Sequence, residues 1–238
     1  MNEVAVIRRC ADDYTPVVEA IRAAFPMTID VHRWEHVRIE RVDSNGQVTA
    51  YVGDAPLDEL RAVFHLGSPA FALPTPTADQ SYVAMERDQS MLAALAACRH
   101  IKIVNRGAVL AGNRGVLEPS GQLRILARIG WATPSVTHSF DLDGNVATKL
   151  RDPEPEAEAQ DLLVIGLRRH VRRGSAPAPA LDPLIAKTQL YMRDAQLDVC
   201  TIPIALTRSG PVAFGIHPGV STDVPRAGLT EILLEAVG

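Results

Sequence analysis

The segment Gly210–Asp223, which reads GPVAFGIHPGVSTD, contains an apolar run that stops on a histidine. His217 follows Ile216 directly, and Pro218 and Gly219 after it favour a turn. An imidazole at a strand end suits two roles. It can serve as a neutral hydrogen-bonding or acid–base group at the mouth of a cleft, or it can satisfy backbone groups at the turn. The apolar run itself offers no carboxylate to pair with the imidazole.

The densest group of positive charge lies in the stretch LRRHVRRGS, with four arginines on both sides of one histidine (Arg168, Arg169, Arg172, Arg173 and His170). Arginine recognises planar anions through two parallel hydrogen bonds, so this cluster suits a phosphate, a carboxylate or an acidic peptide. The alternative is the solvated end of a hairpin that faces the acidic run Asp152–Glu158.

Other residue patterns exclude several kinds of site. His32 and His36 have the spacing of a helical zinc site, but they stand in a strand-like run without the accompanying glutamate. The three cysteines are far apart and form no CxxC pair, which favours reduced thiols. The sequence contains no GxSxG motif, no Walker A motif and no dinucleotide-binding glycine fingerprint. We therefore expect neither a metal site nor a catalytic residue that local motifs can identify.

Composition limits the classes of protein. The 238 residues suffice for one large domain or two small ones, and 47% of them are hydrophobic. The net charge of −4 argues against a nucleic-acid-binding protein that relies on phosphate contacts. No signal-peptide pattern occurs, and no apolar run approaches the roughly 20 residues of a membrane span. We expect a cytoplasmic protein without a membrane partner.

The elements that must position these residues follow a β-α-β order in the first half. Residues 3–9 and 28–34 have strand patterns, and Thr15–Phe25 has helical spacing behind a capping threonine and Pro16. Asn45-Gly46 lies between two alternating runs, which predicts a hairpin. A further strand is predicted at 62–66 and a helix at 85–100. The pattern indicates an α/β fold with an open sheet.

The second half begins with a strand predicted in the stretch 101–107 and ending in Asn105, and a helix is predicted at 119–130 with Gly130 as its stop. An extended stretch follows, then a short strand that carries Lys149. We interpret 161–175 as one strand with a basic end, 183–197 as a helix, 225–237 as the closing helix, and the region between these helices as two strands joined at 207–210.

Three stretches in this order resemble the ATP-grasp superfamily, and in particular its RimK-like and graspetide (microviridin-type) peptide maturases. They are HIKIVNRG, then GQLRILARIGWATPSVTHS, and finally VAFGIHPG. The middle stretch is similar to the family phrase A..G...P.T..T through Ala127, Gly130, Pro134, Val136 and Thr137. The resemblance implies a pre-ATP-grasp α/β domain at 1–115 and a reduced ATP-grasp-like α+β domain at 116–238 that lacks a full central lobe.

The resemblance also implies a chemistry that these residues do not match. Family members activate a carboxylate with ATP, using two phosphate-binding lysines and magnesium ligands: an acid on one late strand and a Glu-x-Asn on the next. Magnesium requires such hard oxygen ligands. Here Cys200–Leu206 contains no carboxylate, and Gly215 and His217 stand where the Glu and Asn belong. Lys149 is either the remaining phosphate lysine or an ordinary surface lysine, because no second lysine accompanies it.

These departures predict a degenerate homologue, a pseudoenzyme that lacks Mg-ATP ligase activity. It would bind a peptide or an active partner ligase in a peptide natural-product (RiPP) pathway, with Lys149, Arg168, Arg169 and His217 as the binding residues. The alternative is an active ATP-dependent carboxylate–amine or –hydroxyl ligase with ATP and magnesium on relocated ligands such as Glu86, Glu118 or Asp223. Family members often dimerise, so the resemblance allows a homodimer, although no segment of the sequence identifies an interface.

Overall fold

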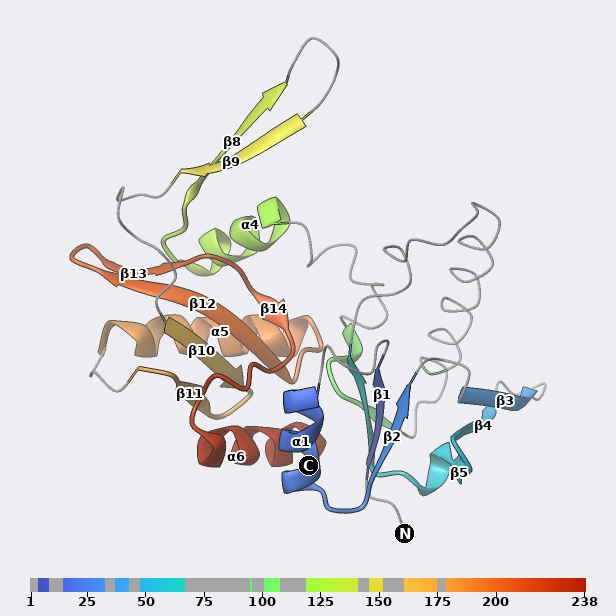
Figure 1. Cartoon of the computed structure of the whole chain (residues 1–238). Helices are drawn as coiled ribbons and strands as arrows, with labels where there is room; N and C mark the ends of the chain where they lie inside the picture. Colours follow the sequence, from blue (N-terminus) through green and yellow to red (C-terminus); the bar gives the residue numbers. More distant parts are fainter. Residues whose placement is uncertain are drawn as a thin grey trace.

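The structure is a computed structural model, and it describes residues 4–8, 15–32, 37–42, 48–66, 95, 101–107, 119–140, 146–151, 161–174 and 179–238. Two main sheets lie side by side, one from each half of the chain, with helices packed on them (Figure 1). This arrangement confirms the predicted α/β class. None of the described helices is long and apolar enough to cross a membrane.

The N-terminal sheet is parallel, in the order β2-β1-β6-β7. Its strands are β1 (Val4–Arg8), β2 (Thr28–His32), β6 (Ala62–Leu66) and β7 (Lys102–Ile103). Every residue of β1 is buried, as its continuous apolar run requires of a strand covered on both faces. Helix α1 (Thr15–Ala24) makes the crossover from β1 to β2.

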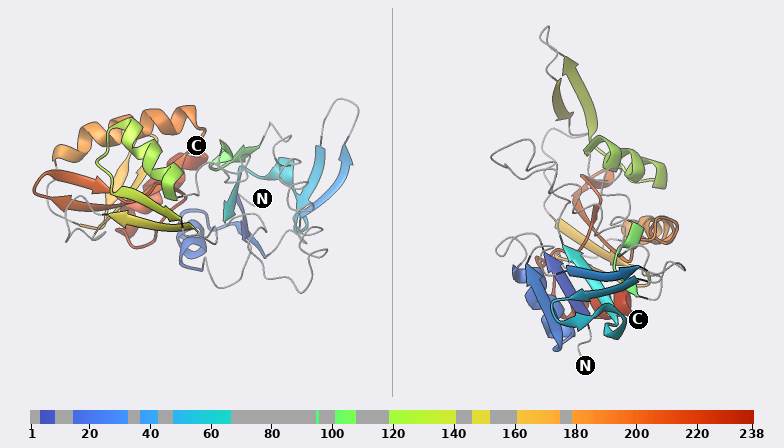
Figure 2. Two further views of the ribbon diagram at one scale, coloured as in Figure 1. Left: turned by 90° about the horizontal axis from the view of Figure 1, so that it is seen from above. Right: turned by 90° about the vertical axis from the view of Figure 1, so that its right-hand side faces the viewer.

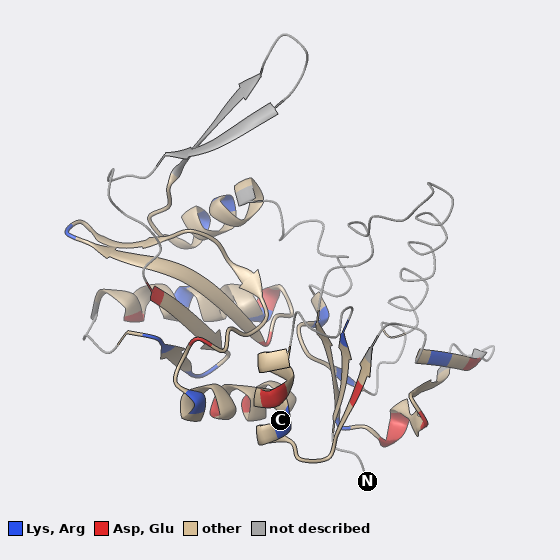
Figure 3. Cartoon of the chain, viewed as in Figure 1, with Lys and Arg blue, Asp and Glu red and all other residues tan. Residues whose placement is uncertain are grey.

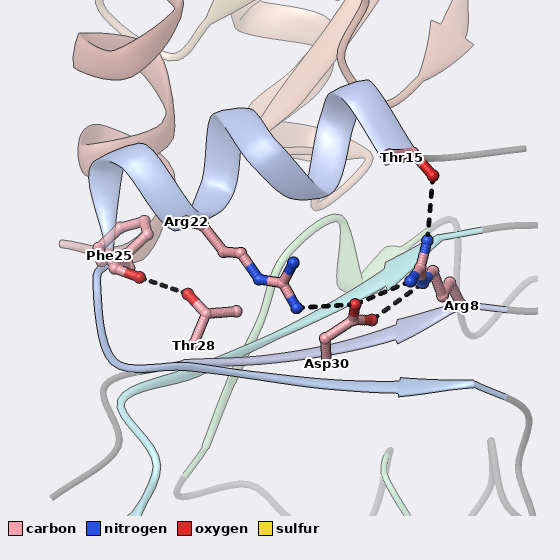
Figure 4. Close-up of polar contacts among 6 residues, drawn as sticks. All are labelled: Arg8, Thr15, Arg22, Phe25, Thr28 and Asp30. Atoms are coloured by element: carbon pink, nitrogen blue, oxygen red, sulfur yellow. Dashed lines mark hydrogen bonds and ion pairs between the residues drawn. The ribbon is translucent and has the colours of Figure 1, made fainter. Parts of the chain in front are cut away.

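A buried carboxylate fastens α1 to this sheet (Figure 4). Asp30 on β2 accepts two hydrogen bonds of 2.9 Å from the Nε and Nη2 atoms of Arg8 on β1, and one of 3.1 Å from Arg22 on α1. Arg8 also donates to the Thr15 hydroxyl at the start of α1. The side chain of Asp30 is only 5% exposed. Its charge is tolerated because the bidentate arginine pair replaces water.

A smaller antiparallel sheet covers the other side of the N-terminal half. It consists of β3 (Val37–Val42), β4 (Val48–Val52) and β5 (Ala55–Pro56), and a short 3-10 helix, η2 (Leu57–Glu59), follows it. The pairing of β3 with β4 confirms the two predicted hairpin strands. The Asn45-Gly46 turn itself lies outside the described residues.

The C-terminal sheet is antiparallel, in the order β11-β10-β12-β13, with β14 also paired to β12. Its strands are β10 (Asp161–Gly166), β11 (His170–Arg172), β12 (Val199–Thr207), β13 (Gly210–Ala213) and β14 (His217–Pro218). Helix α5 (Asp182–Asp194) follows the short η3 (Pro179–Leu181), and α6 (Arg226–Val237) ends the chain. The predicted helices at 183–197 and 225–237 and the late strand pair are therefore confirmed.

The two faces of this sheet belong to two hydrophobic clusters, because successive strand residues alternate between faces. On one face, Cys200, Ile202 and Ile204 pack with Ile185 and Met192 of α5. The other face contributes to a cluster with α6 that also includes residues of β1, α1 and β6 in the N-terminal half. The two halves therefore share one core, and α1 lies against α6 (Figure 1).

Helix α4 (Pro119–Ile129) precedes a two-stranded hairpin of β8 (Ser135–Phe140) and β9 (Val146–Arg151). Gly130 ends α4 with φ of 100°, a value that a side chain disfavours, so the predicted helix stop is confirmed. The hairpin projects beyond α4, away from both main sheets (Figures 1 and 2). The predicted domain boundary near residue 115 and the predicted helix at 85–100, except for Leu95, lie outside the described residues.

Two sequence interpretations differ from the structure. Residues 161–172 form the antiparallel pair β10 and β11, whereas the sequence predicted one strand over 161–175. The chain reverses after the apolar run, where the Gly166 amide donates to the Arg169 carbonyl at 2.8 Å. The strand predicted at 101–107 pairs only through Lys102 and Ile103, because Asn105 adopts a positive φ of 56° and turns the chain.

Candidate functional site

His217 begins β14, where it pairs with Thr201 of β12. Much of the residue is exposed, yet partial burial of the imidazole lowers the pKa of His217 below its ordinary value. The side chain is therefore neutral at pH 7 and can donate one hydrogen bond and accept another. The ring lies beside Gly215, since a Cβ atom placed on that glycine would stand 2.9 Å from Nε2 of His217.

Gln122 of α4 also lies next to Gly215. The Gln122 side chain is buried, and its Oε1 atom accepts a 3.1 Å hydrogen bond from the Ile216 amide. A Cβ atom at position 215 would lie 2.6 Å from this oxygen, closer than such atoms approach. A side chain at this position, where the resemblance places a magnesium-binding glutamate, would therefore require Gln122 and His217 to move from their present places.

The late strands β12 and β13 carry no charged residue. Val199–Thr207 and Gly210–Ala213 contain no aspartate or glutamate, and Figure 3 draws both β12 and β13 in tan. Asp198, which directly precedes β12, is the nearest carboxylate in sequence. Its Oδ2 atom accepts a hydrogen bond of 2.7 Å from the backbone amide of Asn105, and its Oδ1 atom lies 2.5 Å from Nζ of Lys102. This carboxylate is held by the N-terminal half and is not presented to a ligand.

Asn105 completes the junction between the two halves. Its Oδ1 atom accepts hydrogen bonds from the amides of Asp198 (2.7 Å) and Val199 (2.9 Å), so the two residues cap each other's backbone. Both side chains are buried. Next to them, the Gly107 amide donates to the Gln196 carbonyl at 3.1 Å. This junction joins β7 to the start of β12, and it has a structural role that the strand pattern around Asn105 did not reveal.

The basic cluster lies at the β10–β11 turn, beside α6. Arg169 forms an ion pair with Glu231, and its Nε atom lies 3.9 Å from Glu235. The Arg168 amide donates to Glu235 at 2.6 Å, while the Arg168 side chain is exposed. Arg172 contacts Asp161 at 3.2 Å. The acidic partners thus come from α6 and from β10, and the acidic run Asp152–Glu158 lies outside the described residues.

The four predicted binding residues come from three separate places. Lys149 belongs to the projecting hairpin, where its backbone pairs with Thr137; its side chain lies outside the description. His217 and the basic turn lie on one sheet, but β12 and β10 separate them. Three strand spacings of about 4.8 Å put roughly 14 Å between the backbones of His217 and Val171 on β11. Their joint role in binding a ligand stays a prediction.

The residues present do not fit magnesium-ATP at the late strands. The donors there are an imidazole and an amide oxygen that already accepts a backbone hydrogen bond, whereas magnesium requires several free carboxylate or carbonyl oxygens. Among the described residues, no three histidine, cysteine or acidic side chains gather in a way that could hold a metal ion. Sequence reasoning missed Gln122 because a glutamine on an amphipathic helix carries no signal of a contact 94 residues away.

No protein-family model matches this sequence, and no curated protein sequence matches it. Solved structures do. The macrocyclase MdnB from Microcystis aeruginosa MRC has a TM-score of 0.64 at 13% identity, over 99% of this chain and 100% of that chain. The macrocyclase MdnC from the same organism, bound with precursor peptide MdnA, has a TM-score of 0.65 at 12% identity, over 97% and 99% of the two chains.

A RiPP-associated ATP-grasp ligase from Chryseobacterium gregarium, in complex with ADP and a leader and core peptide, is also similar. Its TM-score is 0.61 at 11% identity, over 98% of this chain and 95% of that chain. Identities this low establish a likeness of fold. The chain therefore has the fold of the ATP-grasp ligases, in the form found in RiPP macrocyclases.

Proposed function

We propose that this protein is an ATP-grasp homologue that has lost Mg-ATP ligase activity and binds a peptide or a partner ligase in a peptide natural-product pathway. The observation that carries the proposal is the packed state of the late-strand site. Gln122 and His217 fill the space beside Gly215, and the neighbouring acid, Asp198, is committed to the junction with Asn105. The resemblance implies that magnesium is held at that place, and magnesium requires free oxygen ligands.

Peptide binding is supported by the peptides present in solved structures of similar fold. Two of the similar structures contain a precursor peptide or a leader and core peptide. In this chain, Arg168 and His217 keep exposed side chains that suit the carboxylates and carbonyls of a peptide. We propose them as contact residues, together with Lys149 and with Arg169, which would exchange its pairing with Glu231 for a ligand carboxylate.

The second candidate is an active ATP-dependent carboxylate–amine or –hydroxyl ligase with ATP and magnesium on relocated ligands. Asp223 is the observation in favour of this candidate. Its side chain is exposed in the segment between β14 and α6, six residues after His217 in the sequence. The other two acids considered for this role, Glu86 and Glu118, lie outside the described residues. A nucleotide titration separates the two candidates.

A direct binding experiment tests the first candidate. Fluorescently labelled peptides, taken from short reading frames encoded beside the gene, are titrated with the protein in the absence of nucleotide. We expect saturable binding to one of them, at least tenfold weaker with Arg168→Ala. Arg208→Ala is the matched control, because this exposed arginine lies in the turn between β12 and β13, at the opposite end of the sheet from the basic turn. Binding by no peptide and by no ligase encoded nearby would contradict the proposal, and so would equal losses in the two variants.

A further inference from the structure

Helices α4 and α5 pack against each other in the C-terminal half, and their exposed sides carry positive charge. The exposed cations are Arg124 and Arg128 on α4, and Lys187 and Arg193 on α5. Helix α4 contains no acidic residue, and Figure 3 draws it with blue segments and no red. None of the four cations forms an ion pair with another residue that the structure describes.

Two contacts show that these charges gather where the two helices meet. The Nζ atom of Lys187 would lie 3.2 Å from a Cβ atom on Gly130, the residue that ends α4. Burial raises the pKa of Tyr191 on α5, and the positive charge of Arg128 acts against that rise, so Arg128 lies close to α5. The cations of α4 therefore continue into those of α5 and form one surface.

Local structure explains only part of this charge. Arg128 and Arg193 stand in the last turns of their helices, where cations complement the helix dipole, and Lys187 lies at the same end of α4. Arg124 has no such role. It precedes Arg128 by four residues, and like charges at this spacing destabilise a helix. An anionic partner outside the described residues would remove this repulsion.

An exposed leucine lies on the same surface. Leu190 is 60% exposed, more than any other large hydrophobic residue that the structure describes. It stands three residues from Lys187 and three from Arg193, so all three share one side of α5. A single exposed leucine is ordinary on a protein surface. This one lies between cations, as an apolar contact surrounded by charged contacts would in a docking surface.

We propose that the α4–α5 face docks an amphipathic helix of a partner protein, with its apolar stripe on Leu190 and its aspartates and glutamates opposite the cations. The face is defined by Arg124, Arg128, Lys187, Leu190 and Arg193. Charge complementarity selects an acidic partner: the two helices carry four cations and two acids, a net charge of +2, whereas the whole chain carries −4. Amphipathic helices commonly dock through an apolar stripe with flanking charges.

This inference does not depend on the proposed peptide-binding residues. Those on the C-terminal sheet belong to β14 and to the turn beside α6, and α6 packs on the face of the sheet opposite to α5. Failure of the peptide test at Arg168 would therefore leave the α4–α5 face in place, and failure at the α4–α5 face would leave the basic turn in place.

The test uses a synthetic, fluorescently labelled peptide of about 20 residues, long enough to form a helix, with leucines along one helical stripe and glutamates and alanines elsewhere. Its anisotropy is measured as the full chain is added. We expect saturable binding that weakens as the salt concentration rises. A peptide of the same composition without the stripe should not bind, and neither should a striped peptide with lysine in place of glutamate.

Two variants and two matched controls locate the binding site. Arg124→Glu reverses a contacting charge and Leu190→Asp removes the apolar contact, so each should weaken binding at least about tenfold. The controls are Arg226→Glu and Leu234→Asp, which make the same changes at an exposed arginine and an exposed leucine on α6. Both controls should bind the peptide as the unmodified chain does.

Several results would overturn the proposal. They are the absence of saturable binding of the striped acidic peptide, equal binding of the unstriped peptide, and equal losses in the α4–α5 variants and the α6 controls. The acidic run Asp152–Glu158 of the chain itself is the competing occupant. Binding that appears only after Glu154, Glu156 and Glu158 are replaced by glutamine would assign the face to this run and would also overturn the proposal.

Discussion

The junction between Asn105 and Asp198 makes the sharpest prediction about stability. Asn105→Ala removes the oxygen that accepts the Asp198 and Val199 amides, and both amides are buried. Each buried donor left without a partner costs about 1–3 kcal/mol. The φ of 56° at this position adds about 1 kcal/mol, because alanine disfavours the left-handed conformation more than asparagine does. We expect a loss of about 3–7 kcal/mol in the free energy of unfolding.

Three variants separate these contributions in chemical denaturation followed by circular dichroism. Asn105→Gly loses the hydrogen bonds but accepts the backbone conformation, so it should be about 1 kcal/mol more stable than Asn105→Ala. Lys102→Ala removes only the ion pair to Asp198, in which the lysine side chain is 41% exposed. Because such partly exposed pairs contribute little, its loss should stay below about 1 kcal/mol.

The number of unfolding transitions depends on the hydrophobic cluster that the two halves share. Since one hydrophobic cluster spans both halves, we expect each variant to unfold in a single transition. A loss of less than about 1 kcal/mol for Asn105→Ala would refute the reasoning from buried donors. Equal stability of the alanine and glycine variants would refute the contribution assigned to the backbone.

Three further predictions concern single residues. Burial lowers the pKa of His65 to about 4. Because the unfolded chain takes up this proton near pH 6.5, the contribution of His65 to the free energy of unfolding should be fully present above pH 6.5 and fall by up to about 3 kcal/mol as the pH drops to 4. Denaturation measured over this pH range should show a smaller slope for His65→Gln than for the unmodified chain. Gly215→Ala should destabilise the fold by about 1–3 kcal/mol, and Gln122→Ala should lower that cost in a double-mutant cycle, because the added Cβ meets the Gln122 oxygen. Burial raises the pKa of Cys200 to about 12, so thiol reagents at pH 8 should leave this cysteine unmodified in the native protein and modify it after unfolding, as mapped by mass spectrometry.

The sequence predicted those elements whose signals are local. The continuous apolar run of β1, the capped start of α1 and the glycine stop of α4 each specify their structure within a few residues. The paired strands β3 and β4 follow from the alternating runs on both sides of Asn45-Gly46. From the sequence, the reversal between β10 and β11 was predicted only as the alternative of a hairpin end, because its turn consists mainly of arginines, which carry no turn signal of their own.

The candidate site could be predicted only in part, because its contacts connect distant segments. The absence of carboxylates from the late strands is visible in the sequence. The contact of Gln122 with the Ile216 amide, and the pairing of Asn105 with Asp198, each span more than 90 residues. No pattern of composition or periodicity encodes such pairs. The acidic partners of Arg169 on α6 were missed for the same reason.

The most direct test of the proposed loss of catalysis is a thermal-shift titration with Mg-ATP. A ligand at 100 times its dissociation constant stabilises a protein by roughly 2.7 kcal/mol, which is a readable shift. Because Gln122 and His217 fill the position beside Gly215, we predict no shift with millimolar Mg-ATP. A saturable, magnesium-dependent rise in melting temperature would contradict the account and favour an active ligase with relocated ligands.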